Sequence, residues 1–313
     1  MYTIAEIVTI TGGRFLLNEN EAAAIDHLLI DSRKLLFPST TLFFAIAGPR
    51  RQGNAFVKDL YNKGVRNFVV DASFKFAAQE YADANVITVP SVLDALQKVT
   101  AHHRAQFNIP VIGITGSNGK TIVKEWLYQL LHGNYTIVRS PKSYNSQIGV
   151  PLSVWQMNAT HSLGIFEAGI SMPGEMEILQ KIIQPTIGVI TNIGQAHSEG
   201  FESITQKEQE KINLFYNAAA VIYCKDETII DEAILTLQQK GNAFLFSWGQ
   251  NEAATLCITT IQVQAFNTVI KAEFNERNIS ISIPFTNDAA INDAISCWCV
   301  LLHLTIADEI ISA

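Results

Sequence analysis

Long apolar runs, paired cysteines and an excess of basic residues are all missing from this 313-residue sequence. No apolar run approaches the ~18 residues that a membrane-spanning helix needs, so no membrane span is predicted. The N-terminal stretch "MYTIAEIVTITGG" has no basic region followed by an apolar core, which excludes a signal peptide. We therefore expect a cytoplasmic protein.

The four cysteines form no C-x-x-C pair, which favours buried, reduced thiols over a metal site or disulfides. Basic residues number 22 against 29 acidic ones, and the formal net charge of −7 argues against a nucleic-acid-binding protein. Nucleotides are not excluded, because their phosphates need only a local patch of backbone N–H groups. A hydrophobic content of 48% allows large cores, and the length suggests two or three domains.

The pattern of apolar segments divides the chain just before Asn108. Residues 1–106 contain two buried strands, predicted at 41–48 and 65–71, and two helices, predicted at 54–64 and 91–107. Residues 107–313 then alternate strands with helices, which is typical of a mostly parallel sheet covered on both faces. The predicted strands of this second part are 110–115, 135–140, 163–169, 186–192 and 218–224.

The character of the chain changes near its end. Three alternating segments, 254–266, 268–275 and 278–285, predict an added antiparallel β segment, and a helix is predicted over 288–306. The fold class is therefore α/β, with a small N-terminal α/β domain and a central domain of the phosphate-loop type. Ligands of such sheets bind beyond the C-terminal ends of the strands.

The stretch "GITGSNGKT" at residues 113–121 reads as a phosphate loop with unusual spacing. The common pattern requires a glycine at position 114, where this chain has isoleucine. A strand still precedes the loop and a helix follows it, so backbone N–H groups and the helix dipole favour an anion there. Lys120 would contact the β- and γ-phosphates of ATP, and Thr121 would hold Mg²⁺. The predicted nucleotide-binding residues are Thr115, Gly116, Ser117, Asn118, Gly119, Lys120 and Thr121.

Polar residues follow the next predicted strands. Glu167 ends one strand, Asn192 and His197 follow the next, and Lys211 lies on a helix 14 residues after His197. Taken alone, Glu167 could be a loop carboxylate, His197 a structural histidine and Lys211 a solvated lysine. Together at one edge of the sheet, they predict a site where Mg²⁺ bridges ATP and a second substrate.

At this point the sequence resembles the Mur ligase family. The motifs that carry the resemblance are T-G-S-N-G-K-T, F-E-A-G, N-I-G-Q-A-H and the lysine downstream. The family's loop lacks the first glycine of the common pattern, which accounts for the spacing here. "DSRKLLFPSTTLFFAIAGPRRQGNAF" is similar to the family's uridine-diphosphate-binding N-terminal domain. "SYNSQIGVPLSV" and "EAGISMPGEMEIL" are similar to the MurF branch, which joins D-alanyl-D-alanine to UDP-N-acetylmuramoyl-tripeptide in peptidoglycan synthesis.

The resemblance implies roles for residues of the central domain. Lys120, His197 and Lys211 would be catalytic, and Thr121, Glu167, His197 and Lys211 would surround magnesium. Lys211 matches a lysine that is carbamylated in many members of the family. Asn192 and Asn292 match positions near the adenine or ribose of ATP.

The resemblance also implies where the UDP-muropeptide binds. Asp31, Ser32 and Arg33 match a motif for the uridine nucleotide. A loop that faces the muropeptide matches Ser143, Asn145, Ser146 and Gln147.

The sequence departs from the family's pattern in three places. Gln52-Gly53-Asn54 stands where Asp-Gly-His is frequent, and Asp288 stands where histidine is frequent. The third, C-terminal ligase domain of the family is absent from this chain, and some members are also fused to an alanine racemase. Two alternatives stay open, namely a MurE-type ligase that adds a single amino acid and a non-catalytic nucleotide- or muropeptide-binding module.

Overall fold

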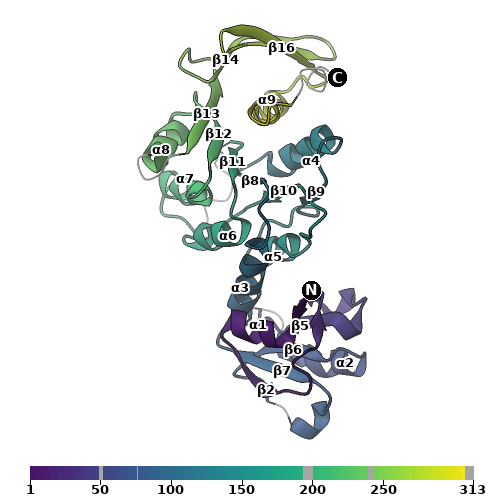
Figure 1. The fold of residues 1–313 in the computed structure, drawn as a ribbon. Coiled ribbons are helices and arrows are strands. Elements are labelled where there is room, and N and C mark those ends of the chain that lie inside the picture. Colours follow the sequence, from purple (N-terminus) through teal and green to yellow (C-terminus); the bar gives the residue numbers. More distant parts are fainter. Residues whose placement is uncertain (49–51, 76, 193–199, 239–242, 307–313) are drawn as a thin grey trace. The chain divides into compact units, whose positions relative to one another are not determined.

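The computed structural model describes residues 1–48, 52–75, 77–192, 200–238 and 243–306 (Figure 1). The chain divides into two units, Met1–Gln106 and Phe107–Ala313, which are the ranges given above for the two domains. Within the described residues, no helix combines the length and the apolar character required to cross a membrane.

The first unit is built on a five-stranded sheet in the order β2-β7-β6-β5-β4. Strands β4 to β7 run parallel, whereas β2 pairs antiparallel with β7 at one edge. A separate two-stranded ladder joins β1 and β3. The strands are β1 (Tyr2–Thr3), β2 (Arg14–Leu17), β3 (Ala24–Ile25), β4 (His27–Leu29), β5 (Thr41–Phe44), β6 (Asn67–Asp71) and β7 (Asn85–Val89).

Helix boundaries in this unit follow local capping chemistry. A capping box of Thr3 and Glu6 starts α1, and the Ser91 hydroxyl accepts from the backbone N–H of Asp94 to start α3. The helix predicted over 54–64 is split into a 3-10 turn, η3, followed by α2. The helical segments are α1 (Ile4–Thr11), η1 (Ser32–Lys34), η2 (Pro38–Thr40), η3 (Gly53–Phe56), α2 (Val57–Asn62), η4 (Ala78–Tyr81) and α3 (Val92–Arg104).

The second unit contains a nine-stranded sheet in the order β16-β15-β14-β13-β12-β11-β8-β10-β9. The seven strands β8 to β14 pair parallel with their neighbours in this order. Strands β15 and β16 extend the sheet beyond β14 with antiparallel pairing. Their bounds are β8 (Val111–Thr115), β9 (Ile137–Arg139), β10 (Leu163–Glu167), β11 (Ile187–Ile190), β12 (Ala220–Cys224), β13 (Phe244–Gly249), β14 (Leu256–Val263), β15 (Thr268–Phe274) and β16 (Arg277–Ile283).

The helices of this unit connect the parallel strands and close the described chain. They are α4 (Lys120–Leu131), α5 (Gly149–Val154), α6 (Glu175–Ile183), α7 (Ile204–Ile212), η5 (Asn213–Phe215), α8 (Thr228–Gln238) and α9 (Asp288–His303). The helix predicted over 288–306 ends at His303, because Thr305 adopts a left-handed φ of 53° that does not continue a helix. The predicted α/β class, with a mostly parallel sheet and an added antiparallel segment, is confirmed.

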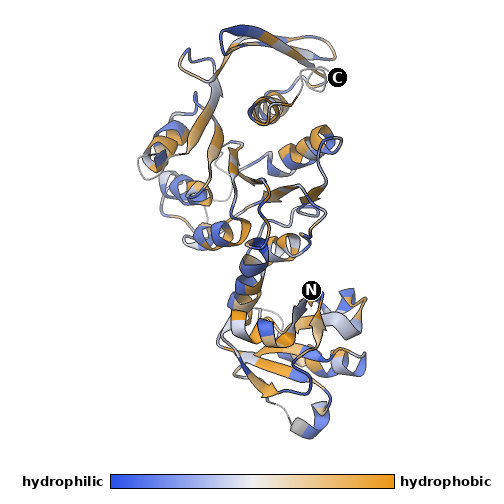
Figure 2. Cartoon of the chain, viewed as in Figure 1, coloured by the Kyte–Doolittle hydropathy of each residue, from blue (hydrophilic) through white to orange (hydrophobic). Residues whose placement is uncertain are grey.

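The core of the second unit lies between its sheet and the helices α4 and α9. Ile112 and Ile114 of β8 are fully buried, as are Val123 and Leu127 of α4 and Ile295 of α9. Figure 2 shows apolar residues along the central parallel strands, and both apolar and polar residues on the surrounding helices. This packing fixes the C-terminal edge of β8 and the start of α4, where the phosphate loop lies.

Candidate functional site

The loop 116–119 connects the end of β8 to the start of α4. Gly116 has a φ of 140° and Gly119 a φ of 81°, conformations that side-chain-bearing residues rarely adopt. A Cβ on Gly116 would lie 2.1 Å from the Thr191 hydroxyl, and one on Gly119 would lie 2.3 Å from a carboxylate oxygen of Asp293. Both glycines are therefore required by backbone conformation and by space. Gly119, the N-cap residue of α4, has no side chain to bond the first N–H groups of the helix, and the helix dipole favours an anion at this end.

The residues that follow β11 hold this loop in place. The backbone N–H groups of Ser117 and Asn118 donate to Asn192, to its carbonyl at 2.8 Å and its side-chain Oδ1 at 3.0 Å respectively. The Thr191 hydroxyl donates to the Asn118 carbonyl. Asn192 thus supports the loop from a neighbouring strand, and its predicted contact with the adenine or ribose stays a prediction.

Lys120 folds back over the loop. Its ammonium donates to the carbonyls of Gly116 at 2.7 Å and Ser117 at 3.2 Å. Burial lowers the pKa of Lys120, and the nearby Glu167 carboxylate partly opposes that shift. The loop carbonyls thus hold the ammonium beside the start of α4, where a bound phosphate would meet both a cation and the helix N-terminus.

Thr121 and Glu167 meet at the C-terminal edge of β8 and β10. The Thr121 hydroxyl donates to Oε2 of Glu167 at 3.0 Å, and the Glu167 side chain is fully buried. Among the described residues, Oε1 of Glu167 accepts no hydrogen bond, although the Lys124 ammonium lies 2.8 Å away as an ion-pair partner. A hydroxyl beside a buried carboxylate oxygen suits Mg²⁺, which prefers oxygen ligands and takes its other ligands from phosphates and water.

His197, the other predicted metal ligand, lies outside the described residues. Within the described part of the chain, no group of three or more histidine, cysteine, aspartate or glutamate side chains could hold a metal on its own. Thr121 and Glu167 could contribute oxygen ligands to a magnesium ion at this position.

Lys211 reaches the same loop from α7. It is 3% exposed, and its ammonium donates to the Ser117 hydroxyl at 2.8 Å. Burial lowers the pKa of Lys211 to about 8, the nearby Glu208 carboxylate opposes this shift, and the cations of Lys207 and Lys120 add to it. The structure therefore brings Lys120, Thr121, Glu167 and Lys211 together around one loop, and their catalytic and metal-binding roles stay predictions.

Glu208 was not anticipated from the sequence. It is fully buried, its Oε1 lies 3.9 Å from the Lys211 ammonium, and neither of its oxygens accepts a hydrogen bond from any described residue. Burial raises its pKa to about 7. The Glu/Lys-rich pattern of this helix suggests a solvated face and gives no signal that Glu208 is buried.

Two more charged residues at the site were missed. Lys124 lies one turn after Lys120 on α4, on the same helix face, and this i, i+4 spacing is a signal that could have found it. Asp293 of α9 is 4% exposed beside Gly119, and burial raises its pKa to about 6. Asn292, the predicted nucleotide contact, is half-buried and points elsewhere around α9 because successive helical residues are about 100° apart.

The predicted muropeptide loop begins beside the metal end of the site. The Ser143 hydroxyl lies 3.3 Å from the Thr121 hydroxyl, and the Asn145 carbonyl accepts from the Gly169 N–H at 2.8 Å. The Ser146 hydroxyl accepts from the Gly149 N–H, and the Gln147 amide donates to the Glu175 carbonyl. These contacts fix the loop next to Glu167, and its role toward a peptide stays a prediction.

The predicted uridine motif belongs to the first unit. Asp31 receives two hydrogen bonds from the Arg33 guanidinium, at 2.9 and 2.7 Å, which lower the pKa of Asp31 to about 2. Ser32 starts the short helix η1 between them. The Arg33 side chain is 74% exposed, so its other N–H groups are accessible to a ligand.

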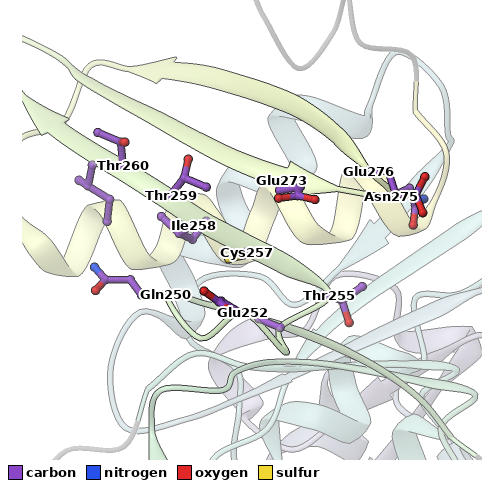
Figure 3. A pocket seen from close by; sticks show the side chains of 12 residues that line it. Gln250, Glu252, Thr255, Cys257, Ile258, Thr259, Thr260, Glu273, Asn275 and Glu276 are labelled. Carbon is purple, nitrogen blue, oxygen red and sulfur yellow. The ribbon is translucent and has the colours of Figure 1, made fainter.

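A separate hollow lies on the antiparallel extension of the second unit (Figure 3). Glu252, Glu273 and Glu276 are among the side chains that line it, together with Cys257 and Asn275. In the sheet order, β11, β12 and β13 separate β14 from β8, so this hollow is not part of the phosphate-loop site.

Comparison with known families decides the assignment. Residues 114–301 match the Mur ligase middle domain, and residues 24–104 match the Mur ligase family catalytic domain. The chain belongs to the Mur ligase family. The resemblance drawn from the phosphate loop and the motifs after it is confirmed.

Relatives of the chain within the Mur ligase family belong to the MurF branch. The chain is 31% identical over 234 residues to the UDP-N-acetylmuramoyl-tripeptide–D-alanyl-D-alanine ligase of Bacillus subtilis, covering 74% of this chain and 50% of that protein. The chain spans about half the length of the curated relatives it matches.

Solved structures share the fold over most of the chain. A crystal structure of MurF from Acinetobacter baumannii superposes with a TM-score of 0.84 at 23% identity, covering 99% of this chain and 66% of that one. MurF from Thermotoga maritima in complex with ADP gives a TM-score of 0.79 at 20% identity, covering 92% and 65%.

Proposed function

We propose that this chain is the substrate- and nucleotide-binding part of an ATP-dependent ligase. The whole enzyme would add D-alanyl-D-alanine to UDP-N-acetylmuramoyl-tripeptide in the cytoplasmic synthesis of peptidoglycan precursors. The observation that carries the proposal is the meeting of Lys120, Thr121, Glu167 and Lys211 around residues 116–119. The B. subtilis relative carries the name of this activity, and the T. maritima neighbour binds ADP, which supports the nucleotide.

The proposed reaction forms an amide from a carboxylate, which is a poor acyl donor until it is activated. The terminal carboxylate of the tripeptide attacks the γ-phosphorus of ATP, the bond to ADP breaks, and an acyl phosphate forms. The amine of D-alanyl-D-alanine then attacks the acyl carbon, inorganic phosphate leaves, and the amine gives up a proton.

Each residue of the site has a part in this scheme. The N–H groups at the start of α4 and the Lys120 ammonium would bind the β- and γ-phosphates and stabilise the charge on the transferring group. Thr121 and Glu167 would hold Mg²⁺, with His197 as a further ligand. Magnesium, when bound, would neutralise charge on the phosphate oxygens.

Lys211 would act as a carbamate. An amine reacts with carbon dioxide only when it is neutral, and the reaction gives a carbamate and releases a proton. A pKa near 8 makes the neutral amine more abundant at physiological pH than in an ordinary lysine. The resulting carboxylate-like group would lie beside Ser117, within the same cluster as Glu167 and Lys120.

Each unit carries residues that match motifs for one part of the second substrate. Asp31, Ser32 and Arg33 would contact the uridine nucleotide, and Ser143, Asn145, Ser146 and Gln147 would face the peptide. Asn192 and Asn292 would lie near the adenine or ribose.

The experiment that tests this function is a ligation assay on the full-length protein. ADP release and product mass are measured with UDP-N-acetylmuramoyl-tripeptide plus D-alanyl-D-alanine, and separately with UDP-N-acetylmuramoyl-dipeptide plus single amino acids. Product in the first mixture alone supports the proposal. Product in the second alone would assign a MurE-type ligase, and binding without ADP release in either would assign a non-catalytic binding module.

A further inference from the structure

Lys124 is a buried lysine with no role in the scheme above. Its side chain is fully buried on α4, one helical turn after Lys120. A buried ammonium is costly unless charges and hydrogen bonds around it compensate for the lost water. The groups around the Lys124 ammonium therefore indicate the role of this residue.

Three segments meet at the Lys124 ammonium. It donates to the Ser140 carbonyl at 2.8 Å and to the Lys142 carbonyl, and it lies 2.8 Å from Oε1 of Glu167. Glu125 lies 3.2 Å away and is itself paired with Arg139 at 2.7 Å. One cation thus joins α4 to the end of β10 and to the turn after β9.

The turn after β9 depends on this contact for its shape. Lys142 has a φ of 51°, in the left-handed region that a residue with a side chain adopts only at a cost. The Lys142 carbonyl is one of the two that Lys124 binds, and the next residue is Ser143, 3.3 Å from the Thr121 hydroxyl. Ser140 also accepts from the Glu167 N–H through its hydroxyl, at 3.3 Å.

The orientation of Glu167 depends on the same cation. Its Oε2 accepts from Thr121, while Oε1 has only the Lys124 charge as a partner among the described residues. Without that ammonium, Oε1 would lose its ion-pair partner at 2.8 Å, and the bond from Thr121 to Oε2 would fix the carboxylate less tightly. Groups that orient a metal ligand in this way affect metal affinity without touching the metal.

We propose that Lys124 is a positioning residue that sets the Glu167 carboxylate and the turn 140–143 in one arrangement. The metal end of the nucleotide site and the start of the peptide-facing loop are then assembled together. This inference rests on the proposed function in one respect, which is that Glu167 faces a metal–nucleotide complex.

The test compares Lys124→Met with wild type and with Lys181→Met in the 313-residue chain. Lys181 pairs with Glu177 at 2.8 Å on the surface of α6, so its variant also removes a lysine–carboxylate pair in the same unit. The affinity for ATP is measured in the presence of Mn²⁺, as a probe for Mg²⁺, and again in EDTA. We expect Lys124→Met to reduce the gain in affinity from Mn²⁺ by about tenfold or more, as for other metal-orienting groups. Affinity in EDTA, and both affinities of Lys181→Met, should match wild type.

A second measurement, of hydrogen–deuterium exchange, is made without metal. Hydrogen–deuterium exchange of peptides covering 140–147 should be faster in Lys124→Met than in wild type, and unchanged in Lys181→Met. A merely structural role would lower the thermal stability without altering the ratio of the two ATP affinities. If Lys124→Met does not fold, Lys124→Gln takes its place, since it removes the charge but keeps two N–H donors on a shorter side chain.

The outcomes separate this inference from the proposed function. A folded variant with a wild-type gain from Mn²⁺, or with wild-type exchange over 140–147, overturns the role of Lys124 and leaves the proposed function intact. A wild-type chain whose ATP binding does not respond to Mn²⁺ overturns both.

Discussion

The Lys211 ammonium donates a hydrogen bond of 2.8 Å to the Ser117 hydroxyl, although the two residues are 94 positions apart in the sequence. The contact places a lysine of α7 on the phosphate loop between β8 and α4. The phosphate loop and the lysine of α7 therefore belong to one site, and substitutions in either can test it.

Replacing Lys211 should separate a carbamate role from a simple cationic role. We expect Lys211→Ala to abolish most ligation by the full-length protein, and short carboxylates such as acetate or propionate to restore part of it. The reason is that a small carboxylate can occupy the space of the carbamate. Ligation rates with and without the acid measure this effect, and Lys181→Ala is the control. A loss that amines restore and carboxylates do not would contradict carbamylation.

Lys120 offers a sharper test of the phosphate loop. Lys120→Ala should lower turnover by about 100-fold or more, as for other groups that stabilise transition-state charge. The fold should be preserved, because the Lys120 ammonium bonds only loop carbonyls within the described residues. Steady-state ligation and thermal unfolding measure the two effects. Near-wild-type ligation by a folded variant would remove Lys120 from the mechanism.

The buried carboxyl group of Asp293 should make the free energy of unfolding depend on pH. Its folded-state pKa of about 6 lies above its ordinary value, so the unfolded chain loses this proton first and ionisation favours unfolding. The penalty is absent below about pH 4, grows as the pH rises to about 6, and is complete above that.

The substitution Asp293→Asn should remove this penalty. We expect a gain of about 1–2 kcal/mol in the free energy of unfolding at pH 7, and little or none at pH 4. Urea unfolding at the two pH values measures it. Asp288→Asn, an exposed aspartate of the same helix, is the control and should not reproduce the gain. Equal effects at both pH values would rule out ionisation of Asp293 as the cause.

The sequence predicted the parts of the site that depend on local pattern. The strand, the glycines and the helix around Lys120 are contiguous, and Glu167 follows an apolar strand directly, so their positions at one sheet edge follow from topology. The short strands β1 to β4 were not assigned, because each spans two to four residues and exists only through pairing with distant strands.

The burial of particular charged residues could not be predicted from the sequence. Lys124 and Glu208 lie in helices that also carry exposed charges, and only the packing of neighbouring elements decides which charge is buried. Asn292 and Asp293 are adjacent, so a shift of one position along α9 changes which of them faces Gly119. That rotation is set by the core contacts of Ile295 and Trp298 and not by any local motif.

The first unit should provide most of the affinity for the UDP end of the substrate. Arg33→Ala removes an exposed guanidinium whose partner Asp31 orients it, and we expect about tenfold weaker binding of a UDP-muramoyl peptide. Calorimetric titration measures the affinity. Lys63→Ala, which removes an exposed lysine paired with Asp59 in the same unit, is the control. Unchanged affinity in Arg33→Ala would argue against the Asp31–Arg33 site.

Residues 1–313 should bind substrates without joining them. The relatives that the chain matches are about one and a half times as long. The resemblance to the family implies a third domain that would cover the nucleotide and orient the incoming amine. Without such closure, water reaches the site, so an acyl phosphate would form slowly and be hydrolysed before it met an oriented amine. We expect the 313-residue chain to bind the UDP-muropeptide, to bind ATP weakly, and to give no D-alanyl-D-alanine product. Calorimetry and product mass measure these properties, with the full-length protein as the positive control. Multiple turnovers by the 313-residue chain alone would mean that its two units hold the complete catalytic apparatus, including the means to orient the amine.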